Sequence, residues 1–170
     1  MYEREDRSDR IYGAGSRLEK SAVRKGPGPQ YQPGRPVDND TSNGTKFFYD
    51  KEDRYGFPNG TYTSPVKNGI PYDYVERSLP YVEDKSLYHQ YIVKGDFTNI
   101  KYYIDNCKNQ ELKAQVEASI LKYHGGNYDG LKTYIGDIAP GFGTVKGGTQ
   151  VQLPLTVEQL KGLGLIEELE

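Results

Sequence analysis

The side chains best suited to chemistry in this sequence stand beside turn-forming residues, in three separated segments. These are residues 53–65 (DRYGFPNGTYTSP), residues 76–80 (ERSLP, followed by Tyr88 and His89) and residues 141–154 (GFGTVKGGTQVQLP). The arginines of the first two segments carry guanidinium groups, which make charge-assisted bonds to phosphate oxygens. Tyrosines add aromatic faces, and the glycines let a backbone approach a ligand closely. The set therefore suits an anionic ligand that carries aromatic rings.

Each of these signals also has a purely structural interpretation. Arg54 and Arg77 are of a type that commonly forms surface salt bridges. A histidine such as His89, on an apolar strand face, is often a hydrogen-bonded core residue. The glycines at 147–148 match neither GxxxxGK[ST] nor GxGxxG, so they are also explained by an ordinary hairpin turn.

Carboxylate pairs and nucleophilic serines are the next candidates for a reactive centre. Glycosidases place two carboxylates around the bond that they cleave, and Asp50, Glu52 and Asp53 are close enough in sequence to be considered. Three acids in a turn, however, are typical of a solvated surface. Ser64 stands in TSP and not in GxSxG, so no nucleophile elbow is present. The residues alone thus indicate a class of ligand and no reaction.

Composition limits the classes of protein that remain. A chain of 170 residues allows one globular domain with a tail, and its net charge of −2 lacks the basic excess of a nucleic-acid binder. Cys107 is the single cysteine and the two histidines are well separated, so we expect no internal disulfide and no metal site. No stretch approaches the length of a membrane span, and the first ten residues lack the apolar core of a signal peptide.

Residues 1–45 are interpreted as a flexible linker or N-terminal arm, and residues 46–170 as the folded domain. The run KGPGPQYQPGRP disfavours regular structure because of its Pro and Gly content. A short helix at residues 16–24 would have only a thin apolar face. The arm is either a joint to a larger delivery protein, a clasp for a partner, or a solvated tail.

The domain itself shows short aromatic segments between turns, and these favour strands. The clearest is residues 87–93 (LYHQYIV), in which strand alternation places four side chains on one side, namely Leu87, His89, Tyr91 and Val93. Residues 109–123 have the spacing of an amphipathic helix that Gly125 and Gly126 would end. Thr156 and Gln159 form a capping box for a second helix, at residues 157–163. Strands mixed with a few short helices, without a βαβ rhythm, predict an α+β fold with a small mixed or antiparallel sheet.

Taken together and in this order, the segments resemble the tuberculosis necrotizing toxin domain family, whose members end polymorphic toxins and also occur in fungal surface NAD glycohydrolases. The matching text is DRYG, GTYTSP, RSLP, YHQYIV, and GFG followed by GGTQVQLP and VEQL. The match spans residues 48–166, and the combination is far more specific than any one piece. The family fold that it implies is a small sheet domain similar to the ADP-ribosyltransferase core. Residues 100–136 resemble an insertion into that fold.

The resemblance also implies a set of site residues. It assigns the catalytic residues Tyr62, Arg77, His89 and Gln150, and the substrate-binding residues Arg54, Tyr55, Ser64 and Phe142. We expect the two arginines to hold a pyrophosphate and Tyr62 to pack against the nicotinamide or its ribose. Gln150 would orient the ribose hydroxyls or the attacking water. His89 would be a hydrogen-bond anchor, a weak base or a positioned structural residue.

The activity implied by the resemblance is hydrolysis of NAD, and commonly NADP, to nicotinamide and the ADP-ribose product. The dinucleotide is then the substrate and no cofactor is needed. The family also implies delivery within a larger secreted toxin, action in the cytoplasm of a target cell, and a cognate immunity protein. Two other classes stay open: a catalytically silent module that binds NAD or ADP-ribose, and a toxin nuclease, which the missing histidine pair, acid cluster and basic surface disfavour.

Overall fold

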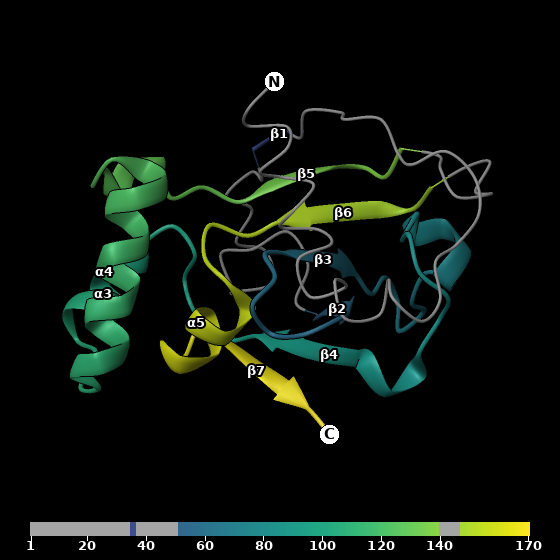
Figure 1. Cartoon of the computed structure of the whole chain (residues 1–170), viewed down its shortest axis with the longest axis horizontal. Helices are drawn as coiled ribbons and strands as arrows, with labels where there is room; N and C mark the ends of the chain where they lie inside the picture. The colour runs from purple at the N-terminus through teal and green to yellow at the C-terminus, as the bar shows by residue number, and fades with distance from the viewer. Residues whose placement is uncertain (1–34, 37–50, 140–146) are drawn as a thin grey trace.

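The computed structural model describes residues 35–36, 51–139 and 147–170, and its described strands form one antiparallel sheet (Figure 1). The strands run in the order β1-β5-β6-β3-β2-β4-β7. Their bounds are β1 Arg35–Pro36, β2 Lys51–Tyr55, β3 Tyr62–Pro65, β4 Tyr88–Val93, β5 Tyr134–Asp137, β6 Thr149–Gln152 and β7 Ile166–Leu169. The predicted α+β fold is confirmed, and neighbouring strands of the described sheet pair antiparallel.

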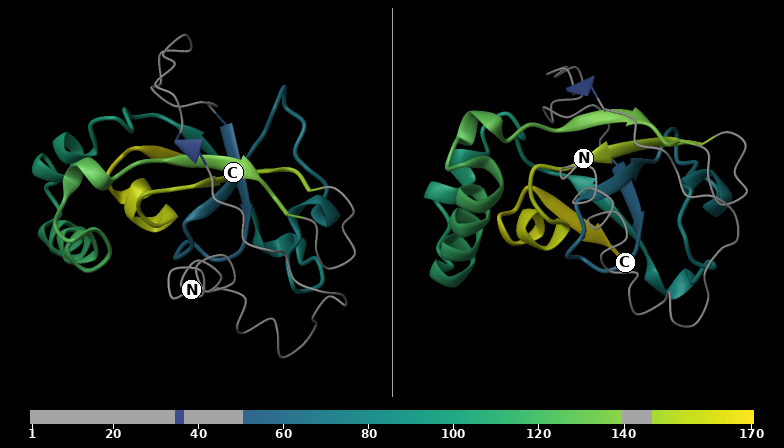
Figure 2. Two further views of the ribbon diagram at one scale, coloured as in Figure 1. Left: turned by 90° about the horizontal axis from the view of Figure 1, so that it is seen from above. Right: turned by 45° about the horizontal axis from the view of Figure 1, so that its top comes forward.

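The helices gather at one end of the sheet (Figures 1 and 2). They are α3 Ile100–Asp105, α4 Gln110–His124 and α5 Val157–Gly162. The described residues also form three short 3-10 turns, η2 Tyr74–Arg77, η3 Lys85–Leu87 and η4 Tyr128–Gly130. Helix α4 begins where the Asn109 side chain accepts the Leu112 amide, and it ends at Gly125 in the left-handed conformation. None of the described helices is long and apolar enough to cross a bilayer.

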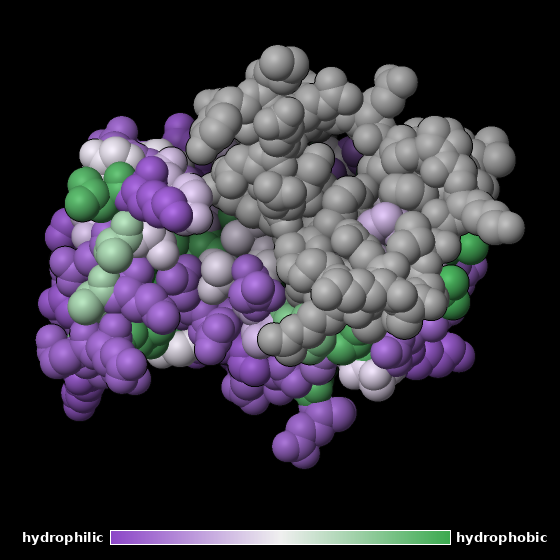
Figure 3. Space-filling view, in the orientation of Figure 1, coloured by the Kyte–Doolittle hydropathy of each residue, from purple (hydrophilic) through white to green (hydrophobic). Residues whose placement is uncertain are grey.

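The hydrophobic core lies between the helices and one face of the sheet. Its most buried members come from both layers, and they include Tyr91, Val151, Ile104, Val116 and Leu160. The segment 100–136 therefore contributes to the core through α3 and α4. On the face drawn in Figure 3, hydrophilic side chains cover most of the described surface and apolar patches are scattered.

Three local predictions are confirmed. Strand β4 falls in the segment 87–93, helix α4 in the segment around 109–123, and helix α5 opens with the capping box of Thr156 and Gln159. The expected helix at residues 16–24 lies outside the described residues. The boundary between an arm and a domain at residue 45 and the likeness to an ADP-ribosyltransferase core stay predictions.

Candidate functional site

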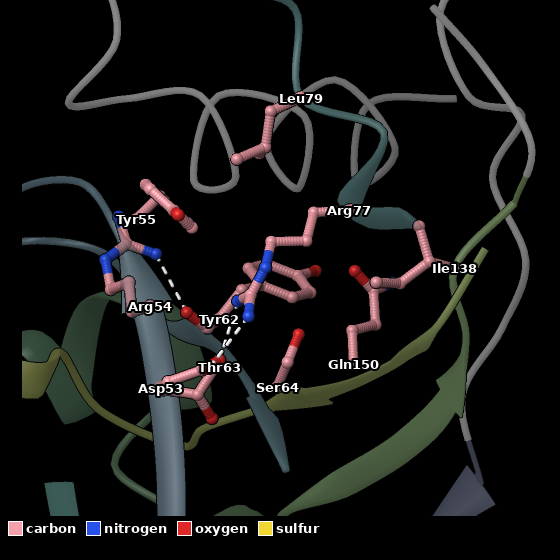
Figure 4. A pocket seen from close by; sticks show the side chains of 10 residues that line it. All are labelled: Asp53, Arg54, Tyr55, Tyr62, Thr63, Ser64, Arg77, Leu79, Ile138 and Gln150. Atoms are coloured by element: carbon pink, nitrogen blue, oxygen red, sulfur yellow. Dashed lines mark hydrogen bonds and ion pairs between the residues drawn. The ribbon is translucent and has the colours of Figure 1, made fainter. Parts of the chain in front are cut away.

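Side chains from the three separated segments line one pocket, most of them from the sheet face that lies away from the core (Figure 4). Register sets this face, because residues directly opposite each other point the same way and neighbours along a strand alternate. Asp53 lies opposite Ser64 and Gln90, while Thr63 lies opposite Val151 of the core. The pocket is lined by Asp53, Arg54, Tyr55, Tyr62, Thr63, Ser64, Arg77, Leu79, Ile138 and Gln150. Six of the eight predicted site residues are thus brought together.

Arg77 occupies the centre of the pocket in an ion pair with Asp53. Nη1 donates to Oδ1 of Asp53 at 2.6 Å and Nη2 donates to Oδ2 at 2.7 Å, while Nε and Nη2 donate to the Tyr72 carbonyl. Both partners are buried, since Arg77 is 7% exposed and Asp53 is 0% exposed. Burial alone would lower the pKa of Arg77, but the hydrogen bonds and charge of Asp53 outweigh it and raise that pKa. Four of the five guanidinium N–H donors have acceptors within the described residues, and one on Nη1 points to no acceptor there.

Two tyrosine rings flank this ion pair. The Arg77 Cζ atom lies 5.1 Å from the centre of the Tyr55 ring and 5.8 Å from that of Tyr88, within the range of cation–π attraction. The Tyr88 hydroxyl donates to Asp53 Oδ2 at 2.8 Å and accepts from Gln90 Nε2 at 2.8 Å. Burial raises the pKa of Tyr88 to about 12, so its hydroxyl stays protonated at neutral pH. The network fixes the position of the guanidinium from three sides.

Contacts across the end of the sheet hold η2, and with it Arg77, against β6. The Gly148 amide donates to the Glu76 carbonyl at 2.9 Å, and the Ser78 hydroxyl donates to the Ala139 carbonyl at 2.8 Å. Ser78 has φ of 47°, which ends the 3-10 turn in the left-handed region. Position 148 requires glycine, because a Cβ atom there would overlap the Tyr72 ring. The glycine at 148 thus allows close packing between β6 and the segment that carries Arg77.

Arg54 makes a different set of contacts. Its Nη1 donates to the Tyr62 carbonyl at 2.8 Å and its Nε to the Phe57 carbonyl at 3.1 Å, so the guanidinium braces the turn between β2 and β3. Arg54 is 4% exposed, and burial lowers its pKa. In Figure 4 its guanidinium lies apart from the cluster formed by Arg77, Ser64 and Gln150. The structure therefore gives Arg54 a bracing role at the edge of the pocket.

Gln150 is a polar lining side chain that can bind a ligand. It is half-buried, and its carboxamide has no hydrogen bond to any described residue. Figure 4 shows it extending toward Arg77 and Ser64. An amide that both donates and accepts suits hydroxyl groups or a water molecule.

Two predicted site residues do not join the cluster. His89 lies opposite Arg54 in the register, on the core face of the sheet, and does not line the pocket. Its Nδ1 lies 3.3 Å from Oε2 of Glu168, and its side chain is 31% exposed. Phe142 lies outside the described residues.

The expectation that the acids around residue 52 form a solvated turn was wrong. Glu52 and Asp53 belong to strand β2 and are 3% and 0% exposed, and Asp50 lies outside the described residues. Both carboxylate oxygens of Glu52 are buried without a hydrogen-bond partner in the described part of the chain. Burial, then the charge of Asp53, raises the pKa of Glu52 well above its ordinary value. Within the described residues, no group of three or more His, Cys, Asp or Glu side chains is placed to hold a metal ion.

The pocket is small, with a volume of about 40 Å³. This space is enough for ordered water among the polar lining groups.

Comparisons with known proteins find few relatives. No family model matches the sequence, and no curated protein matches it. Six chains among solved structures match. One comes from the atomic structure of tuberculosis necrotizing toxin complexed with its immunity factor, with 19% sequence identity and a TM-score of 0.49. The match covers 81% of this chain and 56% of that chain, so this chain spans little more than half of the other's length.

Proposed function

We propose that this domain hydrolyses the bond between nicotinamide and ribose in NAD. One observation carries the proposal: residues from three separated motifs line one pocket. They are Tyr62, Ser64, Arg77 and Gln150. Their sequence separation is large, so a chance likeness of short motifs would not require them to meet. The pocket joins a fixed guanidinium to an amide that has no hydrogen-bond partner among the described residues, and a phosphate-bearing sugar can use both groups.

The reaction breaks the bond from the ribose C1′ atom to the ring nitrogen, and the electron pair of that bond stays with nicotinamide. The ring is positively charged in NAD and leaves neutral, so the leaving group needs no proton. Positive charge develops on the ribose, a water oxygen bonds to C1′, and its proton passes to solvent. In this proposal Gln150 positions the water or the ribose hydroxyls, and Tyr62 packs against the ring or the sugar.

Asp53 limits what Arg77 contributes. The ion pair has no net charge, so Arg77 offers one remaining N–H donor to a phosphate oxygen instead of a full positive charge. The absence of a net positive charge also helps the reaction, because a cation beside the developing ribose cation would oppose it. Arg77 is then a fixed hydrogen-bond donor, and its position depends on Asp53.

The direct test is release of nicotinamide from NAD by purified protein, with a matched pair of variants. Gln150→Ala removes a pocket amide, whereas Gln152→Ala removes the same side chain from the same strand outside the lining residues. We expect Gln150→Ala to lose about a hundredfold or more in kcat, in line with the loss of a positioning donor at an active site. Gln152→Ala should keep most of the activity. Equal rates in the two variants would contradict the proposed role of the pocket.

Arg77→Ala is a poorer test because it leaves the Asp53 carboxylate buried without its partner, which destabilises the fold. Tight binding of NAD without release would instead indicate a binding module. The engagement of Arg77 by Asp53 is compatible with that second candidate, since a rigid neutral pair serves affinity as well as it serves chemistry. Turnover separates the two.

A biological setting follows from the proposed activity. A domain that destroys NAD without a cofactor would act as a toxin, delivered within a larger secreted protein into the cytoplasm of a target cell. The producing cell then needs an immunity protein to protect its own dinucleotide. Co-expression with a neighbouring gene product that abolishes nicotinamide release would test this setting.

A further inference from the structure

A second, wider groove adjoins the pocket on the same face of the sheet. Its volume is about 590 Å³, and four tyrosines line it together with polar side chains. The lining includes Tyr55, Tyr72, Tyr74, Tyr88, Glu83 and Gln90. Tyr55 lines both this groove and the small pocket, so the two spaces adjoin at that residue.

The tyrosines of the groove pack on one another and are held in place. The Tyr55 ring meets the Tyr74 ring edge to face, with centres 4.8 Å apart, and lies 5.0 Å from the Tyr88 ring. The Tyr55 hydroxyl donates to Glu83 Oε2 at 2.6 Å, and the Tyr74 hydroxyl donates to the Tyr81 carbonyl at 2.7 Å. Such a rigid aromatic surface binds a further flat ring without losing much side-chain freedom.

The polar rim of the groove is mainly acidic. Asp73 and Glu83 contribute carboxylates, and Lys85 contributes one cation. Carboxylates accept hydrogen bonds from an exocyclic amine. The groove thus combines stacking faces with acceptors for a flat ring that carries an amino group.

We propose that this groove binds the adenine end of the dinucleotide, an inference that rests on the function proposed above. Arg77 lies between the two spaces: it lines the small pocket and its guanidinium faces the Tyr55 and Tyr88 rings of the groove. Its remaining N–H donor meets the pyrophosphate, with the adenine ring among the tyrosines and the other ribose at Gln150. The nicotinamide ring fits the groove less well than adenine. Carboxylates beside the positively charged ring would stabilise the substrate before the bond breaks, and this would raise the activation barrier of the hydrolysis.

The binding test uses a tryptophan reporter, since the sequence contains no tryptophan. Val75 lines the groove and is 57% exposed, whereas Val82 is 55% exposed and is not among the lining residues. We expect AMP to change the emission of Val75→Trp saturably and to leave Val82→Trp unchanged, and we expect ribose 5-phosphate to change neither. Calorimetry of the unsubstituted chain with AMP guards against a tryptophan that fills the groove itself. No AMP binding by either method, or an equal response to ribose 5-phosphate, overturns the inference.

A kinetic arm separates this inference from the proposed function. Nicotinamide mononucleotide carries the scissile bond and lacks adenine, so its KM should exceed that of NAD by about tenfold or more, the scale of one base stacked on aromatic side chains. Glu83→Ala should narrow that ratio, and Val82→Trp should leave it unchanged. Equal KM values for NAD and nicotinamide mononucleotide would contradict the adenine site and leave the proposed hydrolase activity supported. Saturable AMP binding without any release of nicotinamide would contradict the proposed hydrolase activity and leave the adenine site supported. If Val75→Trp responds to nicotinamide mononucleotide but not to AMP, the groove binds the nicotinamide end and the inference is overturned.

Discussion

Strand β2 carries buried charge to both faces of the sheet, and the two faces handle it differently. On the pocket side, the Asp53 carboxylate has two bonds from Arg77 and one from Tyr88. On the core side, Glu52 has no described partner, and Arg54 donates to backbone carbonyls instead of to a carboxylate. Asp53 thus has a hydrogen-bond partner on both carboxylate oxygens, whereas its neighbour Glu52 has none among the described residues.

The difference separates charge that organises a site from charge that costs stability. A buried ion pair rarely adds net stability compared with apolar residues, yet it becomes costly to break once formed. The Asp53–Arg77 pair therefore has its clearest use in fixing the guanidinium between the two cavities. The unpartnered Glu52 carboxyl offers no such use in the described structure, and the raised pKa expresses its cost.

The largest expected effect is at Asp53. Asp53→Ala leaves the Arg77 guanidinium buried without its counter-charge, and we expect a loss of about 3–5 kcal/mol in the free energy of unfolding. Urea denaturation measures this value. Asp53→Ala combined with Arg77→Met should be less destabilised than the single variant, because the second substitution removes the stranded charge. A single variant within about 1 kcal/mol of the unsubstituted chain would show that the pair is not the organising contact.

A smaller loss of stability is expected from a substitution at Gly60, which packs against the Arg54 guanidinium. A Cβ on Gly60 would overlap the Arg54 guanidinium, which two carbonyl bonds hold in place. Gly60→Ala should therefore cost about 1–3 kcal/mol of unfolding free energy, as for other overpacked sites. Gly130→Ala is the control, because its nearest neighbour atom lies 4.0 Å from the added Cβ. Equal stability of the two variants would mean that Arg54 is free to move and does not brace the turn.

Glu52→Gln should stabilise the protein, and the gain should grow with pH. The folded-state pKa of Glu52 lies above its unfolded value, so the folded state favours the protonated acid. The contribution of this group is most favourable below the unfolded pKa and is lost as pH rises toward the folded one. We therefore expect a clear gain in the free energy of unfolding at pH 8, where burial opposes ionisation of Glu52, and little gain at pH 4.

The matched control for that gain is Glu117→Gln, on the exposed surface of α4. Its unfolding free energy should be unchanged at both pH values. A Glu52→Gln gain that is the same at pH 4 and pH 8 would contradict a pKa raised by burial. That result would mean that Glu52 destabilises the folded protein through its packing and not through its charge.

Local signals made part of the molecule predictable. Helix α4 was predictable because Leu112, Val116 and Ile120 repeat at helical spacing between a capping Asn109 and Gly125, and α5 because of its capping box. The pocket residues were predicted through the motif resemblance and not through their own spacing. Asp53 was missed because its partner Arg77 is 24 positions away, and because the run KEDRY hides a strand behind consecutive charges.

His89 provides the smallest expected effect and the sharpest comparison between the two faces. The motif resemblance made it catalytic, but the register places it on the core side, 3.3 Å from Glu168, which Lys161 also binds at 2.9 Å. We expect His89→Gln to lose less than about 1 kcal/mol of stability, because its side-chain contact with Glu168 is long and partly exposed, and to keep nicotinamide release within about threefold. Gln150→Ala, measured alongside, should lose far more activity at similar stability. If His89→Gln were folded and as inactive as Gln150→Ala, the chemistry would have to reach through the sheet, and the division of β2 into a site face and a core face would fail.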